Sequence, residues 1–182
     1  MTSKKHSLSL PLRRLTYSAV FLALALVLPF LTGQIPEIGS MLCPMHLPVL
    51  LCGFVCGWSW GLGVGLAAPL LRTLLFGMPP VYTAIAMAFE LAAYGAVSGA
   101  LYHCLPKKKA SIYAALLIAM VAGRVVWGVV RFCMAGLQHS TFSFAAFLSG
   151  AVTAAIPGIV LQIVLIPLLV MALSKTKRML NS

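Results

Sequence analysis

Long apolar runs separated by short polar segments make up most of the chain. A transmembrane helix needs roughly 20 predominantly apolar residues to cross ~30 Å of hydrocarbon, and a slightly shorter run can still cross it. The pattern therefore predicts an all-α membrane protein, in which residues 1–182 form a single domain of six transmembrane helices. The predicted spans are residues 15–31, 46–57, 62–76, 82–104, 112–137 and 144–173.

Aromatic, glycine and proline residues mark the boundaries between these runs. The segment Trp58–Gly61 places two tryptophans between the second and third runs, which indicates an interfacial turn with aromatic anchors. Gly77–Pro80 predicts the turn between the third and fourth runs. Pro157 and Pro167 are predicted to interrupt the last run.

Composition and charge exclude a soluble fold and set the orientation. Hydrophobic residues make up 62% of the chain and charged residues 8%, against roughly 25% charged residues in an average soluble domain. The net charge of +11 does not indicate nucleic acid binding, because basic residues beside apolar runs mark the cytoplasmic side of a membrane. The basic clusters lie in residues 4–14, 107–109 and 175–178, so both termini are predicted to be cytoplasmic.

The cysteines and histidines do not suggest a metal site. Five cysteines, an odd number, lack the paired spacing of a disulfide framework. Cys43, Met45 and His46 place soft ligands close together, but no ligand spacing recurs. The sequence therefore predicts neither a metal ion nor another cofactor.

Four charged residues fall inside the apolar runs. A charge in the middle of a membrane helix costs ~2.5–3.5 kcal/mol on insertion scales, so such residues are usually paired or functional. At ~1.5 Å per residue, Arg72 lies ~7 Å, Arg131 ~9 Å, Glu90 ~12 Å and Arg124 ~20 Å below the outer ends of their helices. All four are therefore expected in the outer half or the middle of the membrane.

These residues can line a common cavity. Arg124 and Arg131 are seven residues apart and lie on nearly the same helix face, with Trp127 beside them, and Tyr94 follows Glu90 by one turn. Glu90 can neutralise one arginine and is expected to hold Arg124, and Arg131 or Arg72, nearest the outer surface, is expected to contact any bound anionic group. Two interpretations remain open for the others: structural ion pairs with the second acid or with backbone carbonyls, or a ligand carboxylate or phosphate held by the planar guanidinium.

Enzymatic activity is not expected. The chain contains no Gly-x-x-x-x-Gly-Lys-Ser/Thr phosphate loop. With two acidic residues in all, neither a pair of catalytic carboxylates nor an acid-rich metal site can easily be built.

Small residues recur every fourth position in several runs. Glycines occupy positions 53, 57, 61 and 65, Gly95 is followed by Gly99, and Ala19 is followed by Ala23. Small residues at this spacing let helix backbones approach closely in lipid, so the pattern favours helix packing.

Four segments carry a resemblance to a known family, and they are Pro44–Phe54 (PMHLPVLLCGF), Pro69–Arg72 (PLLR), Phe76–Pro80 (FGMPP) and Met87–Gly95 (MAFELAAYG). In these segments the chain resembles the substrate-binding S-component of bacterial energy-coupling factor (ECF) vitamin transporters. The length, the predicted spans and the cytoplasmic termini agree with that family. The resemblance covers nearly the whole chain.

The resemblance implies a multi-pass protein of the bacterial cell membrane that captures a vitamin at its outer face. It implies delivery through a transmembrane coupling subunit and two cytoplasmic ATPases, which would hydrolyse the ATP. Ala19 and Ala23 match the family's Ala-x-x-x-Ala docking motif for the coupling subunit. The segment from Gln34 to Glu37 resembles the family's lid, and Gln34 and His46 join the candidate substrate-binding residues.

The chain looks most like pantothenate-type members, whose carboxylate an arginine-rich pocket would suit. Members specific for cobalamin, pyridoxine-type compounds, riboflavin or folate remain alternatives, because a shared fold does not determine the ligand. Two other classes also remain open. One is a self-sufficient secondary carrier, for which Glu90 is the available intramembrane acid, and the other is a structural membrane subunit.

Overall fold

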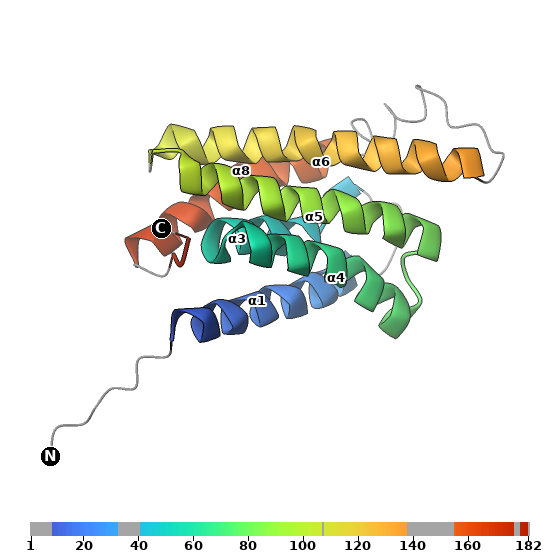
Figure 1. Ribbon diagram of the computed structural model, residues 1–182, viewed down its shortest axis with the longest axis horizontal. Helices are drawn as coiled ribbons and strands as arrows, with labels where there is room; N and C mark the ends of the chain where they lie inside the picture. The colour runs from blue at the N-terminus through green and yellow to red at the C-terminus, as the bar shows by residue number, and fades with distance from the viewer. Residues whose placement is uncertain (1–8, 33–40, 107, 138–154, 177–178, 182) are drawn as a thin grey trace, which may run out of the picture.

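The computed structural model describes residues 9–32, 41–106, 108–137, 155–176 and 179–181, and these residues are almost entirely helical (Figure 1). The elements are α1 (Leu10–Val27), the 3-10 helix η1 (Leu28–Thr32), α3 (His46–Cys56), α4 (Trp58–Phe76), α5 (Val81–Cys104), α6 (Lys109–Leu137) and α8 (Ile156–Lys175).

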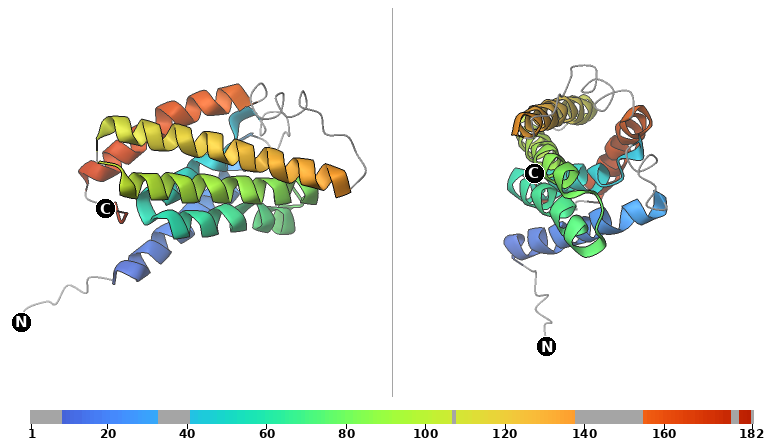
Figure 2. Two further views of the ribbon diagram at one scale, coloured as in Figure 1. Left: turned by 45° about the horizontal axis from the view of Figure 1, so that its top comes forward. Right: turned by 90° about the vertical axis from the view of Figure 1, so that its right-hand side faces the viewer.

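Helices α3 and α5 form the centre of the bundle. All eleven residues of α3 are buried, and α3 contacts α1, α4, α5 and α8. Helix α5 lies between α4 and α6 and packs against both. Figures 1 and 2 show α1 along one side of the bundle and α6 with α8 along the opposite side.

Five helical segments among the described residues are long and apolar enough to cross a membrane: Leu10–Leu31, Trp58–Phe76, Val81–Cys104, Lys109–Gly136 and Ile156–Lys175. At the second predicted span the structure has α3, whose 11 residues extend only ~16 Å at 1.5 Å per residue. The prediction of six complete spans therefore stays a prediction. Residues 144–154 of the last predicted span lie outside the described residues. The predicted interruption at Pro157 and Pro167 is wrong, because both prolines lie within the continuous helix α8.

The interfacial turn predicted at Trp58–Gly61 is wrong. Gly57 alone separates α3 from α4, and Trp58 is already the first residue of α4. Gly57 has φ 105°, a left-handed conformation that glycine adopts without steric penalty. One glycine thus reverses the chain, and no longer turn is needed.

The prediction that the spaced glycines serve helix packing is confirmed between α4 and α5. A Cβ atom added to Gly61 would lie 2.6 Å from the carbonyl oxygen of Gly95. Such a distance is incompatible with any side chain there. The absence of Cβ atoms is what lets these two backbones touch.

The last described residues are bound to the end of α3. The backbone N–H of Leu180 donates to the carbonyl of Val55 (2.9 Å), and the Asn181 amide donates to the carbonyl oxygens of Gly53 (3.3 Å) and Gly99 (2.9 Å). Arg14 of α1 donates to the Leu180 carbonyl (2.6 Å). Residues 180–181, here called the C-terminal hook, thereby join α1, α3 and α5 at one end of the bundle.

Candidate functional site

A buried ion pair lies at the centre of the bundle. Glu90 of α5 contacts the guanidinium of Arg124 of α6, with 2.9 Å between Oε1 and Nη1, and the two side chains are 2% and 17% exposed. The prediction that Glu90 neutralises one intramembrane arginine is confirmed, and the partner is Arg124. The positive charge of Arg124 and the negative charge of Glu90 therefore compensate each other within the bundle.

His46 brings α3 to the same carboxylate. Its Nε2 atom lies 3.4 Å from Oε1 of Glu90, and its ring meets the ring of Tyr94 edge to face at 5.2 Å between centroids. Because an ionised carboxylate only accepts hydrogen bonds, Nε2 carries the proton that points to Glu90, and Nδ1 of a neutral ring is an acceptor. The structure thus brings together three predicted site residues, Glu90, Arg124 and His46, with Tyr94 beside them.

Two residues that the sequence did not assign to this group, Gly123 and Cys43, lie against it. A Cβ on Gly123 would lie 2.9 Å from the Tyr94 ring, so this glycine makes room for the tyrosine. Arg124 Nη2 lies 3.8 Å from Sγ of Cys43, and burial raises the pKa of the Cys43 thiol against the opposing attraction of Arg124. Cys43 drew notice in the sequence only as a potential metal ligand. We call Cys43, His46, Glu90, Tyr94 and Arg124 the central polar cluster.

Arg72 lies in a different environment. Its Nη1 donates to the carbonyl of Leu26 at 2.6 Å, and its guanidinium lies over the rings of Phe30 (4.9 Å) and Phe76 (5.5 Å). Leu26 belongs to the last turn of α1, where carbonyls lack helical partners. Arg72 therefore ties the end of α4 to the end of α1.

Arg131 and Trp127 lie further along α6. The Arg131 guanidinium is 5.9 Å from the centroid of the Trp127 ring, and both side chains are partly exposed. They follow Arg124 toward the end of α6 that is predicted to be outer. Gln34, together with the rest of the predicted lid, lies outside the described residues.

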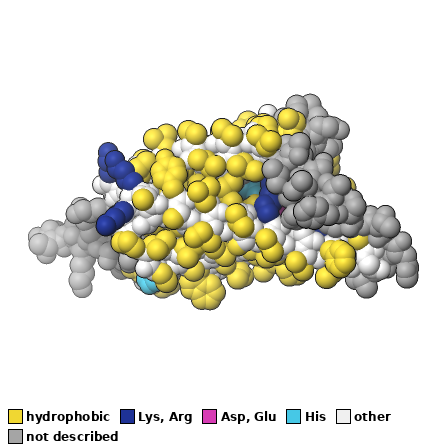
Figure 3. Space-filling model, turned by 90° about the horizontal axis from the view of Figure 1, so that it is seen from above, with side chains coloured by type: hydrophobic (Ala, Val, Ile, Leu, Met, Phe, Trp, Pro, Cys, Tyr) yellow, Lys and Arg dark blue, Asp and Glu magenta, His cyan; other side chains and the backbone are white. Residues whose placement is uncertain are grey.

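Some buried polar atoms within the described chain have no hydrogen-bond partner. In the bundle interior these are Nδ1 of His46, Nε of Arg124 and Oε1 of Gln162. Gln162 of α8 is 2% exposed and was missed by the sequence analysis, because an uncharged residue inside an apolar run carries no obvious signal. Figure 3, which looks onto α6 and α8, shows one basic side chain beside a histidine patch within an otherwise apolar face.

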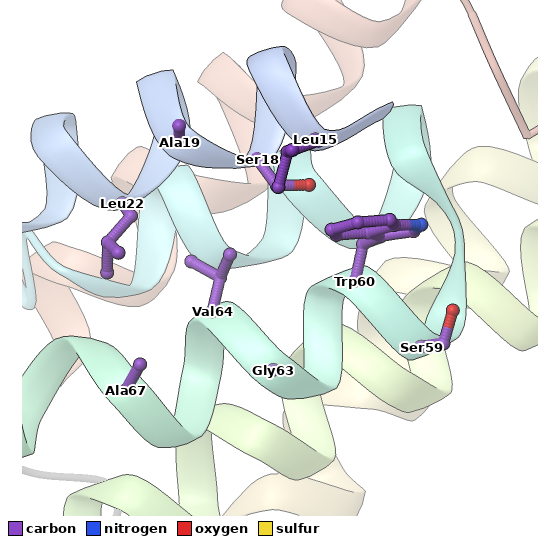
Figure 4. A pocket seen from close by; sticks show the side chains of 9 residues that line it. All are labelled: Leu15, Ser18, Ala19, Leu22, Ser59, Trp60, Gly63, Val64 and Ala67. Atoms are coloured by element: carbon purple, nitrogen blue, oxygen red, sulfur yellow. The ribbon is translucent and has the colours of Figure 1, made fainter. Parts of the chain in front are cut away.

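A separate groove runs between α1 and α4. Its volume is about 590 Å³, and Figure 4 shows it from close by. Ala19 lines it, and both Ala19 and Ala23 are exposed. Its other lining residues are Leu15, Ser18, Leu22, Ser59, Trp60, Gly63, Val64 and Ala67. It contains no charged side chain, so it is not suited to bind an ionic solute.

Residues 13–170 match the model of a protein family described as "ECF transporter, substrate-specific component". The chain belongs to this family. An ECF substrate-specific component, or S-component, is the substrate-binding subunit of an importer and not itself an enzyme. The family implies association with coupling and ATPase subunits and binding of a small molecule.

The family match and the apolar helices together indicate a multi-pass membrane protein. The matched range contains the central polar cluster and both alanines of the predicted docking motif, but not the C-terminal hook. No curated protein and no solved structure matches the chain with significance.

Proposed function

We propose that this S-component captures a vitamin-sized solute with an anionic group, pantothenate being the first candidate, at the outer face of the bacterial cell membrane. The observation that carries the proposal is the central polar cluster, a set of buried ionisable and polar groups inside an otherwise apolar bundle. Buried charges in a membrane protein commonly mark a substrate pathway. Figure 3 also shows basic side chains at the end of the bundle that lies away from the histidine patch. Basic residues at one end support cytoplasmic termini there.

Positive charge supports an anionic solute. Among the described residues, three arginines but one acid lie within the helices at depths expected in the outer half or the middle of the membrane: Arg72, Arg124, Arg131 and Glu90. Glu90 compensates Arg124, and Arg72 is engaged between α1 and α4. Arg131 is our candidate for the anion, because it lies nearest the predicted outer end of α6 and is partly exposed beside Trp127, and Trp127 and Tyr94 would bound the site.

Delivery is proposed to require a transmembrane coupling subunit and two cytoplasmic ATPases. Ala19 and Ala23 support this step, because both are exposed on α1 and exposed small residues let a partner helix approach closely in lipid. The protein on its own should then bind solute without concentrating it.

The proposal is tested by titrating the detergent-purified protein with pantothenate, riboflavin, folate, pyridoxine and cobalamin in a calorimeter. We expect one of them to bind with a dissociation constant below micromolar. Protein reconstituted alone in liposomes with an ion gradient should show no concentrative uptake. Uptake against a gradient would support a secondary carrier instead, and absence of binding to all five would support a structural subunit.

The same titration tests the anion site. Truncating an arginine that pairs with a buried charge on the ligand typically costs ~2–5 kcal/mol, so Arg131→Ala should weaken binding by at least ~30-fold. Lys108→Ala removes an exposed charge near the other end of α6 and should leave the affinity unchanged. Equal affinities in both variants would move the anion site away from Arg131.

A further inference from the structure

Four buried side-chain polar atoms have no hydrogen-bond partner within the described chain. One is Nε of Arg14, near the end of the bundle, and the other three lie deeper: Nδ1 of His46, Nε of Arg124 and Oε1 of Gln162. Buried polar atoms in native proteins almost always have a hydrogen-bond partner, and leaving one without a partner is unfavourable. Gln162 and His46 are 2% and 3% exposed. Their unpartnered atoms are therefore candidates to be satisfied by a bound molecule.

Two of these atoms already share one location. His46 and Arg124 both contact Oε1 of Glu90. Each therefore has one polar atom engaged by the carboxylate and another polar atom left over.

Helix α8 brings Gln162 close to the start of α3. A Cβ on Gly158 would lie 2.7 Å from the carbonyl oxygen of Met41 and 2.9 Å from the carbonyl of Leu42, so the start of α8 lies against the segment that leads into α3. Gln162 is four residues after Gly158, and His46 is four residues after Leu42. Gln162 thus lies one helical turn beyond Gly158, and His46 is the first residue of α3, just after the segment that Gly158 contacts.

Gln162 also lies on the inner face of α8. Gly158, Gln162, Ile166 and Val170 recur every fourth residue and are all buried, which defines one helix face turned to the bundle. Helix α8 packs against α3 and α6, the helices that carry His46 and Arg124. The three unpartnered atoms thus come from three neighbouring helices.

The Glu90–Arg124 ion pair is balanced in charge. Nε2 of His46 lies against the same carboxylate, and a neutral His46 ring with its proton on Nε2 presents Nδ1 as an acceptor. With the His46 ring neutral, the unpartnered set consists of two acceptors, His46 Nδ1 and Gln162 Oε1, and one donor, the N–H at Arg124 Nε. An additional anion here would meet two acceptors and would lie beside the carboxylate of Glu90.

We propose that His46, Gln162 and Arg124 form a neutral subsite that binds the uncharged end of the captured solute through its N–H or O–H groups. The complementary ligand presents two donors and one acceptor, as hydroxyl-bearing amides and amino-substituted heterocycles do. The proposal rests on the capture function proposed above and adds a second recognition point to it. The anionic group then binds nearer the outer end of α6, and the donor-bearing end reaches inward.

The experiment uses the full-length purified protein, with the same five vitamins as probes. Gln162→Leu and Gln162→Met remove the acceptor at similar side-chain size, and Ile166→Val is the control on the same face of α8. For the vitamin that binds the wild type, we expect roughly ten-fold weaker binding in both Gln162 variants. Each variant loses one hydrogen bond to the ligand and leaves the ligand's donor without an acceptor. The control should bind as the wild type does.

Thermal unfolding without solute separates recognition from structure. Because Oε1 of Gln162 has no internal partner, its removal should leave the midpoint temperature unchanged or raise it. Unchanged affinity in both variants overturns the subsite alone, and so does a lower midpoint or a failure to fold, which would reveal an internal role. A wild-type protein that binds none of the five vitamins overturns the capture function and the subsite together.

Discussion

Removing the negative charge of Glu90 should destabilise the protein even without a solute. Glu90→Gln keeps the size of the side chain but leaves the guanidinium of Arg124, 2.9 Å away, without its countercharge. Breaking a buried pair in this way typically costs ~3–5 kcal/mol. Because the Arg124 side chain is 17% exposed, we expect the lower end of that range, about 3 kcal/mol.

Thermal unfolding of the detergent-solubilised protein measures this effect. For a chain of 182 residues, each kcal/mol corresponds to a shift of roughly 2–4 °C in the midpoint, so the variant should unfold about 6–12 °C earlier. Lys108→Gln removes an exposed charge and serves as the control. Its midpoint should match that of the wild type.

A double-mutant cycle gives the decisive comparison. Arg124→Gln alone should also destabilise the protein, because it leaves a buried carboxylate with His46 as its remaining partner. In the double variant Glu90→Gln/Arg124→Gln no charge is stranded, so the two losses should not add, with a coupling energy of roughly 0.5–3 kcal/mol. If the double variant lost the sum of the single effects, the two residues would not stabilise one another and our interpretation of the cluster would be refuted.

Two further predictions concern helix α1 and the C-terminal hook. Ala19→Trp and Ala23→Trp should abolish assembly with the coupling subunit while solute affinity is kept, as measured by co-purification and calorimetry, whereas Ala114→Trp on the exposed face of α6 should assemble normally. Loss of solute binding in both α1 variants would mean that this face is internal. Asn181→Ala removes two hydrogen bonds to buried backbone and should lower the unfolding free energy by ~1–2 kcal/mol without changing solute affinity. An unchanged unfolding midpoint would show that the C-terminal hook does not contribute to stability.

The pairing of Glu90 with an arginine was predictable because charge and depth restrict the choice. Few ionisable residues lie inside the apolar runs, and helix rise places Glu90 between Arg131 and Arg124 in depth. Arg124 was the expected partner, and the packing of α5 against α6 brings its guanidinium to the carboxylate. The environment of Arg72 was not predictable, since its partners, the Leu26 carbonyl and two phenylalanine rings, depend on how the ends of α1 and α4 meet.

Gln162 and Cys43 show a different limit. Neither is charged at neutral pH in an ordinary environment, and both lie among apolar residues, so hydropathy does not distinguish them. Their importance arises from neighbours far away in the chain: Arg124 for Cys43, and the inner face of α8 against α3 for Gln162. The abrupt junction at Gly57 was missed for a related reason, because two tryptophans at a run boundary are compatible with a turn and with a helix start.

The sequence by itself determined the membrane class, most helix positions and the identity of the buried charges, because hydrocarbon imposes strong and local requirements on length, polarity and backbone hydrogen bonding. Only the tertiary structure decided that α3 is a short, fully buried helix, that Arg72 joins α1 to α4, and that His46 shares a carboxylate with Arg124. Those features depend on contacts between helices distant in the chain. Such contacts are chosen by the packing of side-chain shapes, for which a single sequence holds no short-range pattern.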